Sequence, residues 1–256
     1  MSKLEFEPAT IKEWNDEREA FGVLAGDEES SENEAKTWMN EMQIELPQQL
    51  SYTELLKYAA KIHTPFGPDI LTDSKNYDYY LIQVPLTIIV PVNKKLVRLR
   101  LGLDLQAEGK KSGDVVAYDV FPKTEKDVNE VMSGKATLDV SKFLKYITKL
   151  AGVMAPLTAI PAAAIGESFG LNLDLPFKWT SEIVKLQASG PMSNPVQWDV
   201  RDSAIQNGFI GHIILRAPKG SKVHIAAKLA FELRGQGPIG SLWHDFKSSE
   251  PHTFAL

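Results

Sequence analysis

YLIQVPLTIIVPVNKKLVRLRLGLDLQ, residues 80–106, alternates apolar and polar side chains on both sides of Asn93-Lys94. A period of two is typical of β-strands that bury one face. If Asn93 and Lys94 form a two-residue turn, every facing pair on one side of the resulting hairpin is apolar. The sequence therefore predicts an antiparallel hairpin, Tyr80 to Val92 paired with Lys95 to Gln106, which buries Leu99, Leu101, Leu103 and Leu105.

Two prolines limit where the first strand of this hairpin can lie in its sheet. Pro85 and Pro91 lack the N–H group that an interior strand donates on both of its sides. Tyr80 to Val92 is therefore expected to be an edge strand or a bulged one. The run Val115 to Phe121 is expected to add a third strand to the same meander.

The last third of the chain repeats the pattern. Ala217-Pro-Lys-Gly-Ser221 suits a tight turn, with Pro218 at its second position and Gly220 in the left-handed region. The flanking runs then form a second hairpin with one apolar face, in which Leu215 meets Val223. With Glu182 to Ala188 as a further strand, the simplest way to cover the apolar faces is to pack two sheets face to face.

The first part of the chain differs in charge and periodicity. Residues 1–66 hold 6 Lys and Arg against 14 Asp and Glu, a net charge of −8 in a chain whose total is −5. Three hydroxyl-to-glutamate spacings, Thr10 with Glu13, Ser31 with Glu34 and Ser51 with Glu54, predict helix starts. The expected fold class is α+β: an acidic helical region (1–66), then an antiparallel two-sheet, sandwich-like β core (67–256) with a helical and apolar insertion (123–170).

Composition narrows the classes of function. The chain has 256 residues, 43% of them hydrophobic and 24% charged, and contains no cysteine. It therefore has no disulfide and no thiolate metal site. The N-terminal residues resemble no secretory signal, so a cytoplasmic location is expected. The acidic N-terminal region and the absence of a basic run interleaved with aromatic residues argue against a nucleic-acid partner.

The longest stretch of small and apolar residues, Phe143 to Ile165, is interrupted by Pro156 and Pro161. It is too short and too broken for a stable transmembrane helix, which needs about 20 apolar residues. The favoured interpretation is a helical insertion that packs against the open face of a sheet. The alternative is a lipid-interacting element, for which the candidate residues are Lys142, Phe143, Lys145, Ile147, Lys149, Leu157 and Ile160.

A second candidate site is a positively charged patch on the polar face of the predicted C-terminal hairpin. His212 and His224 would be diagonal neighbours there, but no third ligand joins them and the surrounding cations disfavour zinc. No metal site is therefore predicted. The same side chains would attract an anion, and they are His212, Arg216, Lys222, His224 and Lys228.

One short sequence match to a catalytic motif lacks the secondary structure that the motif requires. Gly166-Glu-Ser168-Phe-Gly170 matches the Gly-x-Ser-x-Gly nucleophile elbow, which requires a helix after the serine. The following residues alternate like a strand and reach Pro176, so no helix is expected to begin there. No phosphate-binding loop is present, and no cofactor is predicted.

These observations favour a non-catalytic binding or structural module, with an unidentified protein partner or with further copies of itself. The alternative, from a different class, is a membrane-active protein, either lipid-binding or pore-forming, that uses residues 143–165. A serine hydrolase using Ser168 is the third hypothesis.

Overall fold

Strands dominate the part of the chain that the computed structural model describes. The described residues are 2–3, 6–8, 37, 41–57, 72–111, 113–122, 132–133, 137–138, 178–179, 185–189, 194–201, 205–237, 240–248 and 252–256. They form two seven-stranded sheets and one small two-stranded sheet.

The first sheet, sheet A, is centred on two long strands, β5 (Tyr77–Ile89) and β13 (Ile205–Pro218), which pair antiparallel. On the outer side of β5 lie β3 (Gln43–Leu46) and β4 (Ser51–Glu54), and β1 (Ser2–Lys3) pairs with β3. On the outer side of β13 lie β7 (Val116–Phe121) and β10 (Lys178–Trp179).

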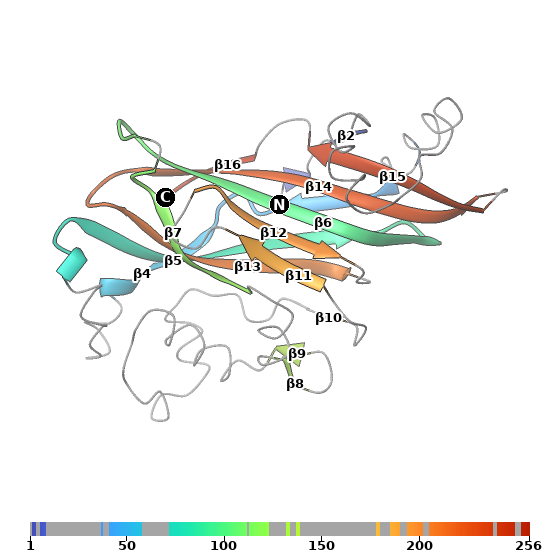
Figure 1. Ribbon diagram of the computed structural model, residues 1–256, viewed down its shortest axis with the longest axis horizontal. Helices are drawn as coiled ribbons and strands as arrows, with labels where there is room; N and C mark the ends of the chain where they lie inside the picture. The colour runs from blue at the N-terminus through green and yellow to red at the C-terminus, as the bar shows by residue number, and fades with distance from the viewer. Residues whose placement is uncertain are drawn as a thin grey trace.

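The second sheet, sheet B, is centred on β6 (Lys94–Ala107) and β14 (Val223–Gly237). Beyond β6 lie β12 (Val196–Arg201) and β11 (Lys185–Ser189), and beyond β14 lie β15 (Gly240–Ser248), β2 (Phe6–Pro8) and β16 (His252–Ala255). Strands β8 (Met132–Ser133) and β9 (Thr137–Leu138) pair only with each other. Figure 1 shows sheets A and B as two stacked layers of long, twisted strands. The predicted two-sheet antiparallel core is thus confirmed.

Both predicted hairpins are wrong in their pairing. Consecutive strands β5 and β6 lie in different sheets, and so do β13 and β14. Leu86 pairs with Phe209 in sheet A, whereas Leu101 pairs with Leu229 in sheet B. Each turn therefore carries the chain from one sheet to the other, as a β-arch. The apolar faces of two strands can be buried when the strands pair within one sheet, and equally when they face each other from opposite sheets of a sandwich. Alternation of apolar and polar residues does not distinguish these two arrangements.

The two arch turns fall close to their predicted places. The Lys94 N–H donates to the Pro91 carbonyl oxygen at 3.1 Å, and Asn93 has φ 65°. The Ser221 N–H donates to the Pro218 carbonyl oxygen at 3.1 Å, and Gly220 has φ 68°. Asparagine and glycine are the residues that tolerate this left-handed conformation best. Pro218 opens its turn instead of occupying the second position.

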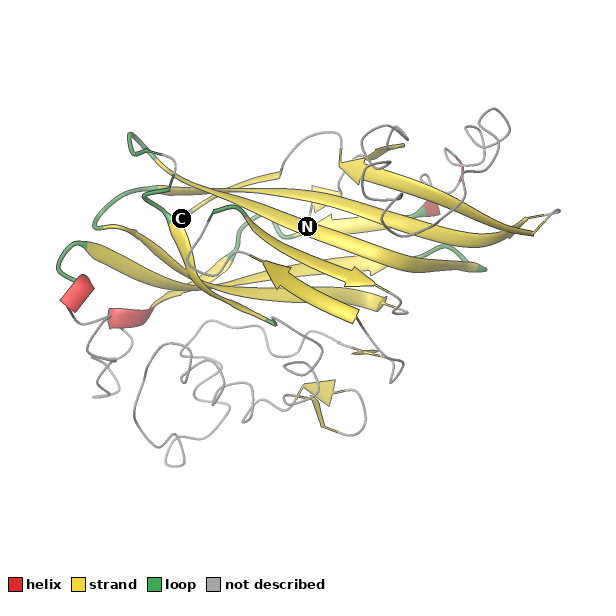
Figure 2. Cartoon of the chain, viewed as in Figure 1, coloured by secondary structure: helices red, strands yellow, loops and turns green. Residues whose placement is uncertain are grey.

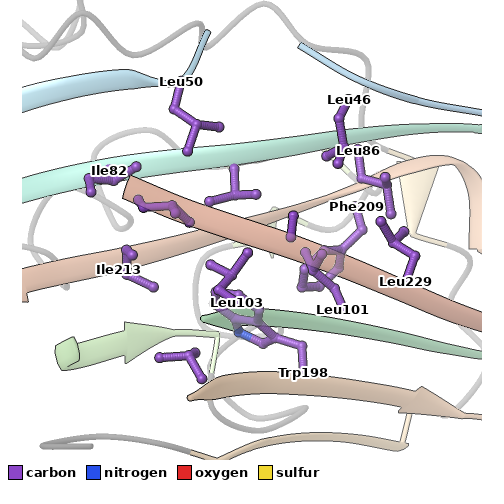
Figure 3. Packing of buried hydrophobic residues seen from close by; sticks show 14 of the residues in the cluster. Leu46, Leu50, Ile82, Leu86, Leu101, Leu103, Trp198, Phe209, Ile213 and Leu229 are labelled. Carbon is purple, nitrogen blue, oxygen red and sulfur yellow. The ribbon is translucent and has the colours of Figure 1, made fainter. Parts of the chain in front are cut away.

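The core lies between the two sheets. Leu99, Leu101, Leu103 and Leu105 are fully buried there, as predicted. Trp198 of β12 crosses this layer: its indole N–H donates to the Pro122 carbonyl oxygen at 3.0 Å, and its ring meets Phe209 edge-on at 5.9 Å. Figure 3 shows Trp198 pointing into the layer together with Leu101, Leu103 and Phe209.

The face of sheet A opposite this core is buried as well. Five side chains of β5 and β13 that point away from sheet B are at most 4% exposed, namely Tyr79, Leu81, Gln83, His212 and Ile214. Sheet A is therefore buried on both faces over this stretch, a situation more typical of the central sheet of a layered fold than of a two-layer sandwich.

Pro85 lies inside sheet A. The expectation that Tyr80 to Val92 forms an edge strand is therefore wrong. On one side Pro85 pairs with Ile210 of β13. On the other side β4 pairs with residues 80–83 and β3 with residues 87–89, which leaves Pro85 opposite the interval between the two short strands. A missing N–H group is tolerated at such an interruption. The predicted strand Val115 to Phe121 exists as β7, but it joins β13 and not the strand before it.

Four strands from residues 1–66 join the two sheets. Ser51 and Glu54, expected to cap a helix, lie in β4, and a short helical turn follows at Leu55–Lys57. Thr37 and Glu41 are helical, but the predicted helix that begins near Thr10 lies outside the described residues. The boundary at residue 66 stays a prediction. No helix among the residues described here is long and apolar enough to span a membrane.

Candidate functional site

The structure separates the residues of the predicted anion patch. His212 and Arg216 lie on β13 in sheet A, whereas His224 and Lys228 lie on β14 in sheet B. Because β13 and β14 do not pair, the two histidines are not the diagonal neighbours that the predicted hairpin required. Lys222 lies between the two strands, directly after the arch turn.

His212 is a buried side chain and not part of a wet surface. It is 4% exposed and its ring lies beside that of Phe121, with the ring centres 6.1 Å apart. Burial lowers the pKa of His212 to about 3, because the charged imidazolium would lose its hydration. His212 is consequently neutral at pH 7 and does not attract an anion.

Arg216 is held by aromatic and acidic neighbours at one end of sheet A. Its guanidinium group lies 4.3 Å from the centre of the Tyr77 ring and donates to the Asp73 carboxylate at 3.3 Å. Asp73 also accepts a hydrogen bond of 2.7 Å from the Tyr79 hydroxyl group, which burial and this bond keep protonated by raising the pKa of Tyr79. Asp73 was not among the predicted site residues, because it is distant from Arg216 along the chain.

Three turns meet at this same end of the sandwich, and we call their described residues together the lysine end: residues 73–76, 108–111 with 113–114, and 218–222. The Lys219 N–H donates to the Asn76 carbonyl oxygen at 2.9 Å, and the Glu108 N–H donates to the Lys222 carbonyl oxygen at 3.0 Å. Strand β5 adds a further tie, since Asp78 accepts a hydrogen bond of 2.9 Å from the Gly220 N–H. In Figure 2 these turns are the green loops at the left end of the two sheets.

The cations and the carboxylates of the lysine end differ in their surroundings. Its cations are exposed, and they are Lys75, Lys110, Lys111, Lys219 and Lys222. The nearby carboxylates bind protein groups instead: Asp73 binds Arg216 and Tyr79, Asp78 binds the Gly220 N–H, and Asp114 accepts a hydrogen bond from the Lys111 N–H at 3.0 Å.

One ion pair joins two side chains of the lysine end. Lys222 and Glu108 approach to 3.7 Å while 77% and 64% exposed. A pair this open to water contributes little stability, so it leaves the ammonium group accessible to a ligand. No linear motif marks the lysine end, because its cations come from three separate stretches of sequence.

A second cluster of charge lies on sheet B. Asp199 of β12 binds Arg98 at 2.7 Å, Arg201 at 2.8 Å and Arg100 at 3.4 Å. Burial alone would raise the pKa of Asp199, but the hydrogen bonds and charges of Arg98 and Arg201 outweigh it and lower that pKa well below its usual range. The cluster ties β12 to β6, a structural role that was not predicted from the sequence.

The remaining candidate residues are those of the predicted lipid-interacting segment and of the serine-hydrolase motif. The predicted lipid-interaction residues lie outside the described residues, and they are Lys142, Phe143, Lys145, Ile147, Lys149, Leu157 and Ile160. Ser168 lies outside the described residues too. The lipid-interaction hypothesis and the serine-hydrolase hypothesis therefore stay predictions. Within the described ranges, no group of three His, Cys, Asp or Glu residues is placed to hold a metal ion.

Comparison with known proteins assigns no family. No protein-family model and no curated protein matches the chain. Among solved structures, one titled "Pore forming protein" aligns with a TM-score of 0.30 and 8% identity, over 70% of this chain and 78% of that one. Clostridium perfringens delta-toxin aligns with a TM-score of 0.27 and 10% identity, over 84% of this chain and 88% of its own. At these TM-scores neither likeness establishes a common fold.

Proposed function

We propose that this protein is a non-catalytic binding module that holds an anionic partner at the lysine end. The observation that carries the proposal is the convergence of five exposed lysines from three turns, Lys75, Lys110, Lys111, Lys219 and Lys222, in a chain whose net charge is −5. A local excess of exposed cations on an acidic protein attracts anions in a preferred orientation.

The scaffold favours this role because it holds the turns in place before any partner arrives. Each turn continues strands of the two sheets, and backbone hydrogen bonds of 2.9 and 3.0 Å tie the turns to one another. A surface that is already ordered loses less conformational entropy on binding. Three nearby carboxylates, those of Asp73, Asp78 and Asp114, are engaged with protein groups, which supports an anionic ligand over a cationic one.

The test is the binding of a fluorescently labelled polyglutamate peptide, followed by fluorescence anisotropy at low salt. We expect the double variant Lys219→Glu/Lys222→Glu to bind about tenfold more weakly than the parent protein. Binding by the parent should weaken steeply as salt is added, because exposed charges are screened.

Lys228→Glu provides the matched control. It reverses one exposed charge on β14, roughly 20 Å along the strand from Lys222 at about 3.3 Å per residue, and is matched in charge to the single variant Lys222→Glu, which is measured beside the double variant. We expect this variant to bind nearly as the parent does. Equal losses in the Lys228 and the Lys219/Lys222 variants would show a non-specific charge effect, and no binding by the parent would contradict the proposal.

A further inference from the structure

Four consecutive apolar residues, Ile89-Val90-Pro91-Val92, form the arch between β5 and β6, and we call them the apolar tip. Val92 is 86% exposed and Ile89 is 52% exposed. Tyr52 is the other large apolar side chain among the described residues that is classed as exposed. In Figure 1 the apolar tip lies at the right end of the sandwich, opposite the lysine end.

The turn itself does not require these side chains. Asn93, with φ 65°, supplies the left-handed conformation that a type II turn needs at its third position, while Val92 precedes it at a position that accepts polar residues. Turn residues are usually polar. Here Ile89 and Val92 expose large apolar side chains to water, while Val90 between them packs against the core. The apolar tip therefore indicates a contact that is absent from the isolated chain.

The shape and size of the tip point to the kind of partner. Two exposed aliphatic side chains on a convex turn are far short of the roughly 800 Å² per partner that a stable protein interface buries. A small-molecule site would be concave. A lipid bilayer requires neither a large flat surface nor a pocket, because aliphatic side chains are accommodated among acyl chains near the headgroups.

The charges next to the tip favour an anionic bilayer. Lys94 and Lys95 follow the tip after Asn93, and Arg234 of β14 pairs with Lys95 in sheet B. Glu41, which is exposed, lies two residues before Gln43, the partner of Ile89 in sheet A. Among the described residues next to the tip, cations outnumber carboxylates, and long lysine side chains reach headgroup phosphates while their stems stay in apolar surroundings.

We propose that the apolar tip inserts into the interfacial region of a bilayer that contains anionic lipids, with Lys94 and Lys95 at the level of the phosphates. This inference goes beyond the proposed function, since it concerns the opposite end of the molecule and a different ligand. Bound in this way, the sandwich leaves the lysine end directed away from the membrane and open to a partner in solution.

The test is co-sedimentation with vesicles of phosphatidylcholine alone and of phosphatidylcholine with phosphatidylserine in a 3:1 ratio. We expect the parent protein to bind the mixed vesicles, and Val92→Asp to bind them about tenfold more weakly, at an unchanged melting temperature because the side chain is exposed. Tyr52→Ser, which removes an exposed apolar side chain near the other end, is the control and should bind like the parent.

Because the chain has no cysteine, a polarity-sensitive dye can be attached at one chosen position. A dye on Val92→Cys should shift to the blue when mixed vesicles are added, and a dye on Lys219→Cys should not. Binding of polyglutamate should be the same for Val92→Asp and the parent, so a failure here is distinct from a failure of the lysine-end proposal.

Three results would overturn the inference. Equal vesicle binding by Val92→Asp and the parent would exclude insertion of the tip. Absence of vesicle binding by the parent would exclude the bilayer as its partner. Concentration-dependent dimers that Val92→Asp abolishes in sedimentation velocity would assign the tip to a second copy of the chain instead.

Discussion

At the scale of single residues, the Trp198 ring of sheet B packs directly on Gly211 of sheet A. A Cβ atom built on Gly211 would lie 2.8 Å from the Trp198 ring. We therefore expect Gly211→Ala to lower the free energy of unfolding by about 1–3 kcal/mol, the usual cost of overpacking a core. Denaturation in guanidinium chloride measures this.

Gly102 is the matched control, because a Cβ atom there would be 3.8 Å from its nearest neighbour, the Lys228 carbonyl oxygen. An ordinary contact of this kind should leave stability within about 0.5 kcal/mol of the parent. If the two alanine variants are equally stable, Trp198 does not pack on Gly211 as described.

His212 predicts how stability depends on pH. Its pKa is about 3 in the folded protein, below the ordinary value of 6.5, because burial disfavours the charged form. As pH falls below 6.5 the unfolded chain binds a proton that the folded protein does not, so stability should decrease by up to about 1.4 kcal/mol per pH unit. The window from pH 6.5 to about 4.5 is informative because carboxylates titrate mainly below it.

Replacing His212 by Leu removes this titration. We expect the unfolding free energy of His212→Leu to be nearly constant across that window, while that of the parent falls, as measured by chemical denaturation at each pH. Parallel curves for the two proteins would mean that His212 is not the group responsible.

The sequence predicts which residues of the central strands are apolar and buried, but it does not show what happens on the other face. Leu101 and Leu103 are recognisable because alternation separates them from Arg100 and Asp104. His212 was assigned to a wet surface by the same rule. The rule failed because sheet A is buried on both faces, and a neutral histidine resembles a surface residue when only the sequence is available.

At the scale of elements, the two β-arches decide the fold. In the structure Asp104 pairs with Ala226, and Thr87 pairs with Gly208. The hairpin expected from the sequence instead sets Thr87 opposite Arg100. Paired positions on adjacent antiparallel strands are close enough for a disulfide, whereas positions on the outer faces of opposite sheets are not.

Pairs of introduced cysteines therefore distinguish the two arrangements without interference from native thiols. We expect Asp104→Cys/Ala226→Cys to form a disulfide on mild oxidation, and Thr87→Cys/Arg100→Cys to remain reduced. Mass spectrometry after thiol alkylation gives the answer. Crosslinking of the second pair alone would restore the hairpin and refute the arches.

The turns of these arches were predictable because asparagine and glycine mark the left-handed positions, Asn93 and Gly220. The pairing was not, since it depends on which long strands meet across a separation of more than 100 residues, as β5 and β13 do. Local periodicity does not show which strands pair when they are so far apart along the chain. The lysine end was missed for the same reason, because it assembles from three turns that only the tertiary fold brings together.

At the scale of the whole molecule, the sandwich separates two different surfaces. The turns of the lysine end lie at one end and the arch of the apolar tip lies at the other (Figure 1). Long strands such as β6 and β14 connect these ends through a continuous core. The account therefore predicts that the two ends bind independently, since residues this far apart share no neighbours.

The most direct test of the central claim is hydrogen–deuterium exchange of the parent protein with and without saturating polyglutamate peptide. We expect slower exchange in peptides that cover residues 108–114 and 218–222, with no change around Ile89 to Val92. Protection confined to other parts of the chain, with residues 108–114 and 218–222 exchanging as in the free protein, would contradict it.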